Sequence, residues 1–329
     1  MTEESTFRVL GSIAVVVLLA ATVMSVADDS GAPVPLTASS SRLIGVPVGS
    51  FSLPAQCDAK GDIYFYAGLA NESVVFEARR DGSHFMHGLS TQDAKDYDYV
   101  SYRVDADGKI AFLVSDRSET PHLFELRDDG TSPTHTKLNA PDDMPASTVY
   151  NFIRLENGHI VVQGYAKPKA AKDGGARAYL AEYDSAGTLV RKTLEKAPGI
   201  DITQWPASTA AAQGEDGSVY ILEPDKIVVL SPSGEVGREI KLAPPQPDYR
   251  PYLLYLAGQR LAVGYAKTEK SPHKLQTLYA LLDASTGQPI RLYEPSPELG
   301  NSLVCFSSDG FIFYRVDHGR IKLVTAAAN

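Results

Sequence analysis

The sequence predicts an all-β protein, a six-bladed β-propeller built from four-stranded antiparallel blades. Three observations support this fold class: a repeat of 41 to 59 residues, a polar turn ending in glycine within each repeat, and β-prone strands on both sides of each turn. A repeat period of this length is typical of propellers and repeat arrays.

The repeat occurs six times. Its turn glycines lie 47, 50, 59, 41 and 52 residues apart and are Gly61, Gly108, Gly158, Gly217, Gly258 and Gly310. Most follow Asp or Asn, and such dipeptides favour hairpins because these residues tolerate the positive φ that tight turns require. A second hairpin follows in each of the first five units, which gives each unit the four strands of a propeller blade.

One unit carries a family likeness. The segment from Asp216 to Leu242 contains Gly217-Ser218-Val219-Tyr220-Ile221, then Ile227-Val228-Val229-Leu230 and Ser233-Gly234. This pattern resembles the NHL-type repeats of six-bladed propellers. The resemblance implies a fold and no substrate, because such propellers host many functions.

The last unit lacks a fourth strand, because only Ile321 to Val324 follows its first hairpin. We expect Arg42 to Leu53, which has strand character, to fill that position and close the ring. Pro47 is tolerable there, since the outermost strand of a blade is an edge. The alternative is that Arg42 to Leu53 is a loose linker.

Ring closure would bring the two cysteines of the chain, Cys57 and Cys305, to the seam between blade 6 and blade 1. Their positions relative to Gly61 and Gly310 point them to opposite blade faces, as two neighbours across a seam require. A disulfide is one interpretation. Two buried thiols are the favoured one, because inner strands of neighbouring blades can lie too far apart for a bond.

The N-terminal segment has a different character. Val9 to Ala27 contains no charge, and as a helix it would be about 28 Å long, which suits a signal sequence or a single membrane anchor. Arg8 before it and Asp28-Asp29 after it indicate an extracytoplasmic domain. We therefore expect residues 1–27 to be the signal or anchor, 28–41 a flexible linker, and 42–329 the propeller.

Composition excludes some partners. The net charge of −9 and the pI near 5.3 disfavour nucleic-acid binding. No linear motif for nucleotide, zinc, hydrolase or redox chemistry occurs, so we expect no cofactor, no metal and no catalytic residue. Membrane contact is expected only through residues 9–27, and the propeller is expected to be a monomeric domain.

One face of the ring is predicted to bind a partner. The connections from the second to the third strand of a blade, and from the fourth strand to the next blade, open on this face, and Gly164-Tyr165-Ala166-Lys167 recurs on it as Gly264-Tyr265-Ala266-Lys267. The expected binding residues are the aromatic and cationic side chains Tyr97, Tyr99, Tyr150, Trp205, Tyr249, Arg250, Tyr252, Lys167 and Lys267. Tyr and Trp suit binding because they combine a large face with a polar tip. Packing between blades is the alternative for the aromatics, and keeping exposed edges soluble is the alternative for the lysines.

These observations predict an exported or membrane-tethered scaffold that binds a protein, peptide or glycan. The alternative is a metal-dependent hydrolase of the lactonase or esterase kind with a site in the central channel. Ligands contributed by several blades would leave no linear motif.

Overall fold

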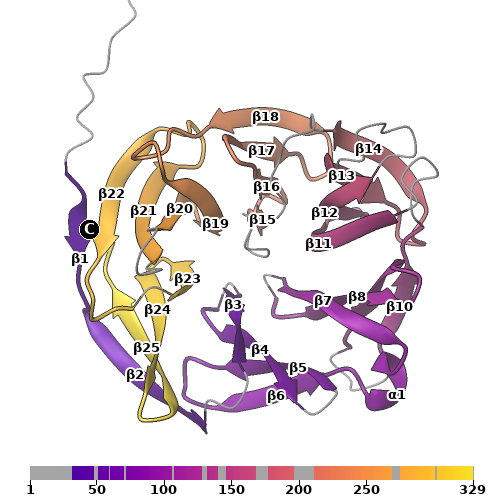
Figure 1. Cartoon of the computed structure of the whole chain (residues 1–329), viewed down its shortest axis with the longest axis horizontal. Helices are drawn as coiled ribbons and strands as arrows, with labels where there is room; N and C mark the ends of the chain where they lie inside the picture. Colours follow the sequence, from indigo (N-terminus) through magenta and orange to yellow (C-terminus); the bar gives the residue numbers. More distant parts are fainter. Residues whose placement is uncertain are drawn as a thin grey trace, which may run out of the picture. The chain divides into compact units, whose positions relative to one another are not determined.

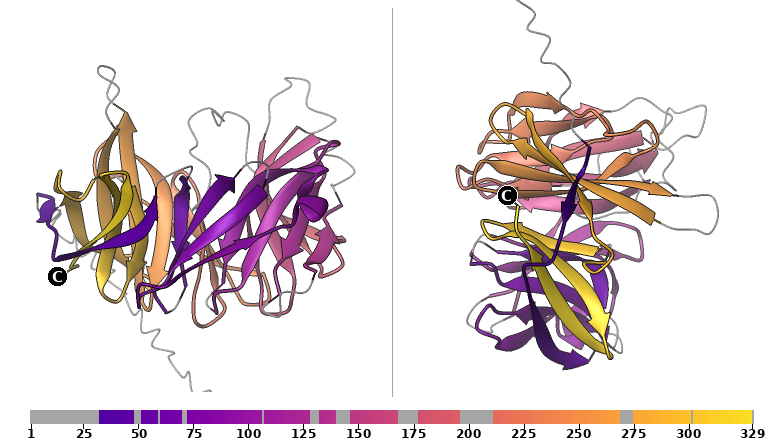
Figure 2. Two further views of the ribbon diagram at one scale, coloured as in Figure 1. Left: turned by 90° about the horizontal axis from the view of Figure 1, so that it is seen from below. Right: turned by 90° about the vertical axis from the view of Figure 1, so that its left-hand side faces the viewer.

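Six antiparallel sheets stand side by side around one axis in the computed structural model of the chain (Figure 1). The structure describes residues 32–47, 51–58, 60–69, 72–105, 107–127, 132–139, 146–167, 177–195, 211–268, 275–300 and 302–328. Side views show the six sheets standing as the blades of one ring (Figure 2). The predicted six-bladed propeller is therefore confirmed.

Each blade is a meander whose first strand lies nearest the axis. Blade 1 contains β3 (Phe51–Cys57), β4 (Ile63–Leu69), β5 (Glu72–Ala78) and β6 (His84–Gly88). Blade 2 contains β7 (Tyr97–Val104), β8 (Ile110–Asp116), β9 (Pro121–Glu125) and β10 (Thr134–Lys137). Blade 3 contains β11 (Ala146–Arg154), β12 (Ile160–Lys167), β13 (Arg177–Tyr183) and β14 (Leu189–Glu195).

The second half of the ring follows the same order. Blade 4 contains β15 (Ala211–Gln213), β16 (Val219–Leu222), β17 (Lys226–Leu230) and β18 (Val236–Lys241). Blade 5 contains β19 (Arg250–Ala257), β20 (Arg260–Thr268), β21 (Leu275–Asp283) and β22 (Pro289–Pro295). Blade 6 contains β23 (Ser302–Ser307), β24 (Gly310–Asp317) and β25 (Arg320–Ala326), completed by β2 (Ser40–Pro47).

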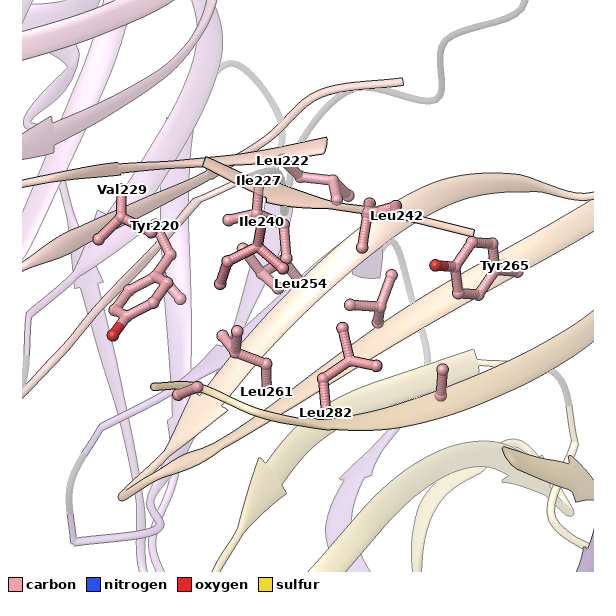
Figure 3. Close-up of a cluster of buried hydrophobic side chains, with 14 of the residues drawn as sticks. Tyr220, Leu222, Ile227, Val229, Ile240, Leu242, Leu254, Leu261, Tyr265 and Leu282 are labelled. Carbon is pink, nitrogen blue, oxygen red and sulfur yellow. The ribbon is translucent and has the colours of Figure 1, made fainter. Parts of the chain in front are cut away.

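The hydrophobic core is divided into six clusters, one between each pair of neighbouring blades. In β16 the alternate residues Val219 and Ile221 pack toward blade 3, whereas Tyr220 and Leu222 pack toward blade 5. A strand buried on both faces reads as a continuous apolar run, which explains the sequence of this strand. Figure 3 shows the cluster between blades 4 and 5.

The turn glycines behave as predicted. All six that follow the first strand of a blade have positive φ, from 56° at Gly258 to 116° at Gly310. At Gly310 an added Cβ would lie 2.3 Å from the carbonyl oxygen of Ala326, so a side chain is excluded by space as well as by conformation. The lack of a side chain at Gly310 therefore lets the end of the chain approach the first hairpin of blade 6 closely.

The ring closes through the N-terminal strand, as expected, but with different boundaries. β2 pairs antiparallel with β25, from Ser40 opposite Thr325 to Pro47 opposite Arg320. The expected closing segment extended to Leu53, but Phe51–Cys57 is β3, the inner strand of blade 1. The boundary differs because blade 1 needs an inner strand of its own to pair with β4.

A further N-terminal strand lies within the stretch expected to be a linker. β1 (Val34–Leu36) pairs parallel to β22 at the outer edge of blade 5, with Val34 opposite Tyr293. Part of residues 28–41 therefore belongs to the folded ring. The N-terminal part of the chain thus adds a strand beyond β22 at the outer edge of blade 5 and then supplies the outer strand of blade 6.

Cys57 and Cys305 form a disulfide between β3 and β23, at the seam between blades 1 and 6. The preference for two free thiols was wrong. Their Cα atoms are 5.7 Å apart, so the inner strands at this seam lie within disulfide reach.

A single short helix occurs among the described residues. α1 (Thr91–Ala94) follows blade 1, and the hydroxyl of Ser90 caps it by accepting a hydrogen bond from the Asp93 amide. In the part of the chain that the structure describes, no helix has the length and apolar character needed to span a membrane. The predicted signal or anchor over residues 1–27 lies outside this part.

Candidate functional site

The inner strands are irregular at a similar height around the ring. In β7, β11, β19 and β23 the register with the second strand shifts by one residue, leaving Val100, Tyr150, Tyr252 or Val304 as the extra residue. Each bulge lies three to five residues before the end of its strand. Bulges redirect side chains and recur beside functional sites, so the axial region is the candidate site.

On the side of blades 1 and 2, aromatic rings form pairs. Tyr99 of β7 stacks on Tyr66 of β4, with ring centroids 3.7 Å apart and an angle of 11° between the planes. Both side chains are half-buried. Burial raises the pKa of the Tyr99 hydroxyl well above its ordinary value, so this residue stays neutral. The pair presents a rigid aromatic surface that joins two blades.

Tyr97 packs against a group of hydrogen-bonded polar side chains in blade 2, formed by Asp116, His122 and His135. Its ring meets that of His122 edge-on, with centroids 4.9 Å apart. His122 lies 3.2 Å from Asp116 through Nε2 and 2.8 Å from His135 Nε2 through Nδ1. Burial, together with the nearby His122, lowers the pKa of His135, which favours its neutral form. The Tyr97 ring thus packs against His122 and is half-exposed.

On the side of blade 5, a lysine covers a tyrosine. The ammonium of Lys267 lies 5.8 Å from the ring centroid of Tyr249 and 3.6 Å from a carboxylate oxygen of Asp248. The Tyr249 hydroxyl donates to Gln276 Oε1, at 3.3 Å. Tyr249 is 4% exposed, so it supports Lys267 more than it offers a surface of its own. The exposed Arg250 folds back and donates to the carbonyls of Pro247 and Tyr249.

Further tyrosines of blade 5 make contacts through their hydroxyl groups. The hydroxyls of Tyr252 and Tyr279 lie 3.3 Å apart. The Tyr255 hydroxyl donates to the carbonyl of Ala55, 3.2 Å away in blade 1. Burial, and to a lesser degree Tyr99 and Tyr255, raises the pKa of Tyr102 far above its ordinary value. The Tyr102 hydroxyl donates to the carbonyl oxygen of Tyr64, so this tyrosine packs against blade 1.

Arg103 of β7 is the charged member of this region. Its Nη2 donates to the carbonyl oxygen of Ala211 in blade 4, at 2.5 Å, so the side chain passes blade 3. The side chain is half-buried, and burial lowers the pKa of its guanidinium to about 10. At neutral pH it still carries its charge.

Two buried polar atoms near this contact have no protein partner. One is the hydroxyl of Ser101, which shares a side of β7 with Arg103. The other is Oε1 of Gln163, which lines a cavity of about 10 Å³ between blades 3 and 4 together with Ala211. A cavity of this size holds about one water molecule.

The structure brings together part of the predicted set. Tyr249, Arg250, Tyr252 and Lys267 lie together at blade 5, and Tyr97 and Tyr99 lie in blade 2. Most of these aromatics lie in the inner strands themselves, whereas the sequence suggested connecting loops. Tyr150 and Lys167 lie in β11 and β12, but their side chains are outside the description, as is the whole of Trp205.

Sequence reasoning missed Arg103, Tyr66 and Tyr255. One signal could have identified Arg103, because it is a charge inside a predicted inner strand of blade 2. No comparable signal marks Tyr255, since its partner Ala55 is 200 residues away. Among the described residues, no group of three or more His, Cys, Asp or Glu gathers in a way that could hold a metal ion.

The fold defines the class of protein, a six-bladed β-propeller. A candidate gluconolactonase of known structure aligns over 89% of this chain and 100% of its own, with a TM-score of 0.50 and 10% identity. The WD40 domain of Pan2 from Neurospora crassa aligns over 90% of this chain and 98% of its own, also with a TM-score of 0.50 and 10% identity. A gluconolactonase from Xanthomonas campestris covers 90% of this chain and 98% of its own, at 14% identity and a TM-score of 0.48.

At such identities these similarities show the fold alone. No protein-family model matches the chain, and no curated protein is similar to it in sequence. The resemblance to NHL-type repeats stays a prediction.

Proposed function

We propose that this propeller is a non-enzymatic scaffold that binds a segment of a protein partner on the face where its inner strands begin. The supporting observation is the stack of two half-buried rings on one side, Tyr99 of the inner strand β7 and Tyr66 of β4, together with Lys267 held over the buried Tyr249 on the other. Rigid aromatics bind with little loss of conformational entropy, and they are enriched at protein interfaces.

A protein partner fits this surface better than a glycan. Tyr66 and Tyr99 each use one ring face on the other, and the Tyr249 ring is covered by Lys267. Open, parallel ring faces of the kind that sugars stack on are therefore reduced among the described residues. Ring edges, hydroxyls and cations remain, and they suit peptide groups and acidic side chains.

We also propose that the propeller works outside the cytoplasm. The charge-free segment from Val9 to Ala27 supports export or tethering. The Cys57–Cys305 disulfide supports the same location, since disulfides persist mainly in oxidising compartments. The measurement is protease accessibility of the propeller in cells whose outer layers are made permeable while the cytoplasmic membrane stays intact; complete protection until the cytoplasmic membrane is opened would contradict the proposal.

The binding proposal is tested by photocrosslinking followed by charge reversal. A photoreactive amino acid at Tyr97 should capture one dominant partner in the cells that produce the chain. The double variant Arg250→Glu and Lys267→Glu should then weaken binding of that purified partner by about tenfold or more.

The matched control reverses two exposed lysines on the opposite face, Lys60→Glu with Lys109→Glu. Both double variants change the net charge equally, so only the position differs. If both double variants weakened binding equally, the effect would come from the net charge of the protein, and the proposed binding face would be wrong. Capture of a glycan in place of a protein would correct the partner class.

A further inference from the structure

We propose that Arg103 is an anchor for one carboxylate group of the bound ligand, held near the axis of the ring. This inference deepens the proposed binding function and rests on it. Arg103 lies near the end of β7 and Tyr97 at its beginning, so a ligand bound at the face where the inner strands begin would have to extend along the axis to reach Arg103. It depends on the geometry of one side chain and on the donors that side chain leaves unused.

Arg103 uses little of its hydrogen-bonding capacity. A guanidinium has five N–H donors, and Ala211 accepts from only one of its nitrogens. Among the described residues, no carboxylate pairs with Arg103, whereas Arg79, Arg154 and Arg191 each pair with a glutamate. Within the part of the chain that the structure describes, Arg103 is therefore an arginine held in the ring without a counter-charge.

The contact with Ala211 sets the direction of the guanidinium. Ala211 lies in the inner strand of blade 4, and Arg103 reaches it from blade 2 past the inner strand of blade 3. A side chain that connects alternate blades must run on the axial side of the strand between them. Its remaining N–H groups thus lie where a ligand entering along the axis would meet them.

The chemistry of the region favours a carboxylate. The planar guanidinium fork matches a carboxylate through two parallel hydrogen bonds, and one cation balances one monovalent anion. A phosphate dianion would need a second cation beside Arg103 to balance its charge. The unpartnered Ser101 hydroxyl, two residues before Arg103 on the same side of β7, adds a neutral donor.

Energetics argue against a purely structural role. Burial lowers the pKa of Arg103, which shows that its surroundings disfavour the charged form. A neutral donor would satisfy the Ala211 carbonyl without that penalty, as the Tyr255 hydroxyl does for Ala55. Unpaired charges that cost stability are typical of binding sites.

The test is an NMR titration of the full chain, labelled with ¹⁵N at arginine, with sodium acetate, an Asp-containing peptide and, as the neutral control, acetamide. We expect a saturable shift of the Arg103 Nε resonance, assigned by its absence in Arg103→Lys, with acetate or the peptide and none with acetamide. Tighter binding of the peptide would identify a side chain of a protein partner as the source, and tighter binding of acetate would identify a small acid.

The variant Arg103→Gln should weaken acetate and peptide binding by about tenfold or more, as expected for the loss of a charge-assisted pair. The control Arg291→Gln removes an exposed arginine from β22, the outer strand of blade 5, and should leave both affinities unchanged. No saturable shift at Arg103 in the unmodified chain, or equal weakening in both variants, would overturn the proposal. Because the titration uses the unmodified chain, its result does not depend on whether a variant folds, nor on which partner the crosslinking identifies.

Discussion

Two side chains cross the ring to the main chain of the next blade but one, and they differ in charge. Tyr255 donates from blade 5 to Ala55 of blade 1, whereas Arg103 donates from blade 2 to Ala211 of blade 4. The tyrosine has one donor and uses it. The guanidinium has five N–H donors and pairs with no carboxylate among the described residues. The neutral contact is thus explained by stability, but the charged contact is not.

The largest expected effect concerns the seam beside the neutral contact. Cys57 lies two residues after Ala55, and its disulfide closes a loop with a sequence separation of 248. Replacing both cysteines, Cys57→Ser with Cys305→Ala, should lower the free energy of unfolding by up to ~5 kcal/mol, because the unfolded chain regains freedom. Urea unfolding measures this. Unfolding of the unmodified chain in reductant should show the same loss, and an unchanged midpoint in both would refute a stabilising seam.

The next effect removes the neutral contact alone. Tyr255→Phe keeps the ring and deletes the hydroxyl that donates to Ala55, leaving that carbonyl without this partner. The free energy of unfolding should fall by about 1–2 kcal/mol. Tyr220→Phe is the matched control, since Tyr220 is similarly buried and no hydroxyl bond is described for it. An equal loss in the control would mean that the hydroxyl contact itself contributes nothing.

The charged contact should respond with the opposite sign. In Arg103→Gln the amide removes a half-buried charge that has no ionic partner among the described residues and keeps a donor, so the free energy of unfolding should stay unchanged or rise by about 1 kcal/mol. The same urea series measures it. A loss of stability as large as that in Tyr255→Phe would show that both hydrogen bonds stabilise the fold, and the proposed difference between the two contacts would then be wrong.

The smallest expected effect concerns Glu77, a buried carboxylate that pairs with Arg79 and His87. Burial alone would raise the pKa of Glu77, but hydrogen bonds from Arg79 and His87 more than offset it, so the pKa lies below its ordinary value. The stability due to ionised Glu77 is therefore complete above the unfolded pKa of about 4.3 and is lost as the pH falls through the folded value.

The unmodified chain should thus lose more stability than Glu77→Gln when the pH is lowered from 7 to 4. Paired urea titrations at the two pH values measure this difference. Identical losses in both proteins would mean that Glu77 gains nothing from its partners on folding. The exposed Glu119→Gln is a suitable control, since it should leave the acid sensitivity unchanged.

Sequence reasoning was strongest where the cause is local. The six blades follow from hairpins whose glycines carry positive φ, such as Gly108 and Gly158, and from apolar runs such as Val219 to Leu222. Turn chemistry and strand burial act over a few residues, so they can be read from the sequence. Closure by the N-terminal strand was predictable because the sixth unit lacked one strand.

Sequence reasoning was weakest where the partner lies far away in the chain. The pairing of Val34 with Tyr293 in β1 and β22 leaves no pattern in either segment. The aromatic residues of the candidate site were found by type, but their stacking and burial were not, as Tyr249 shows by being buried beneath Lys267. Such outcomes depend on which blades become neighbours across the ring.

The sequence by itself determined a six-fold repeat of β-hairpins, an acidic surface and an apolar N-terminal segment. Only the tertiary structure decided that Cys57 meets Cys305, that Tyr66 stacks on Tyr99, and that Arg103 reaches Ala211. The physical reason is that closing the ring brings together inner strands from distant repeats. Local propensity specifies each blade, but the distances between blades exist only once the ring has closed.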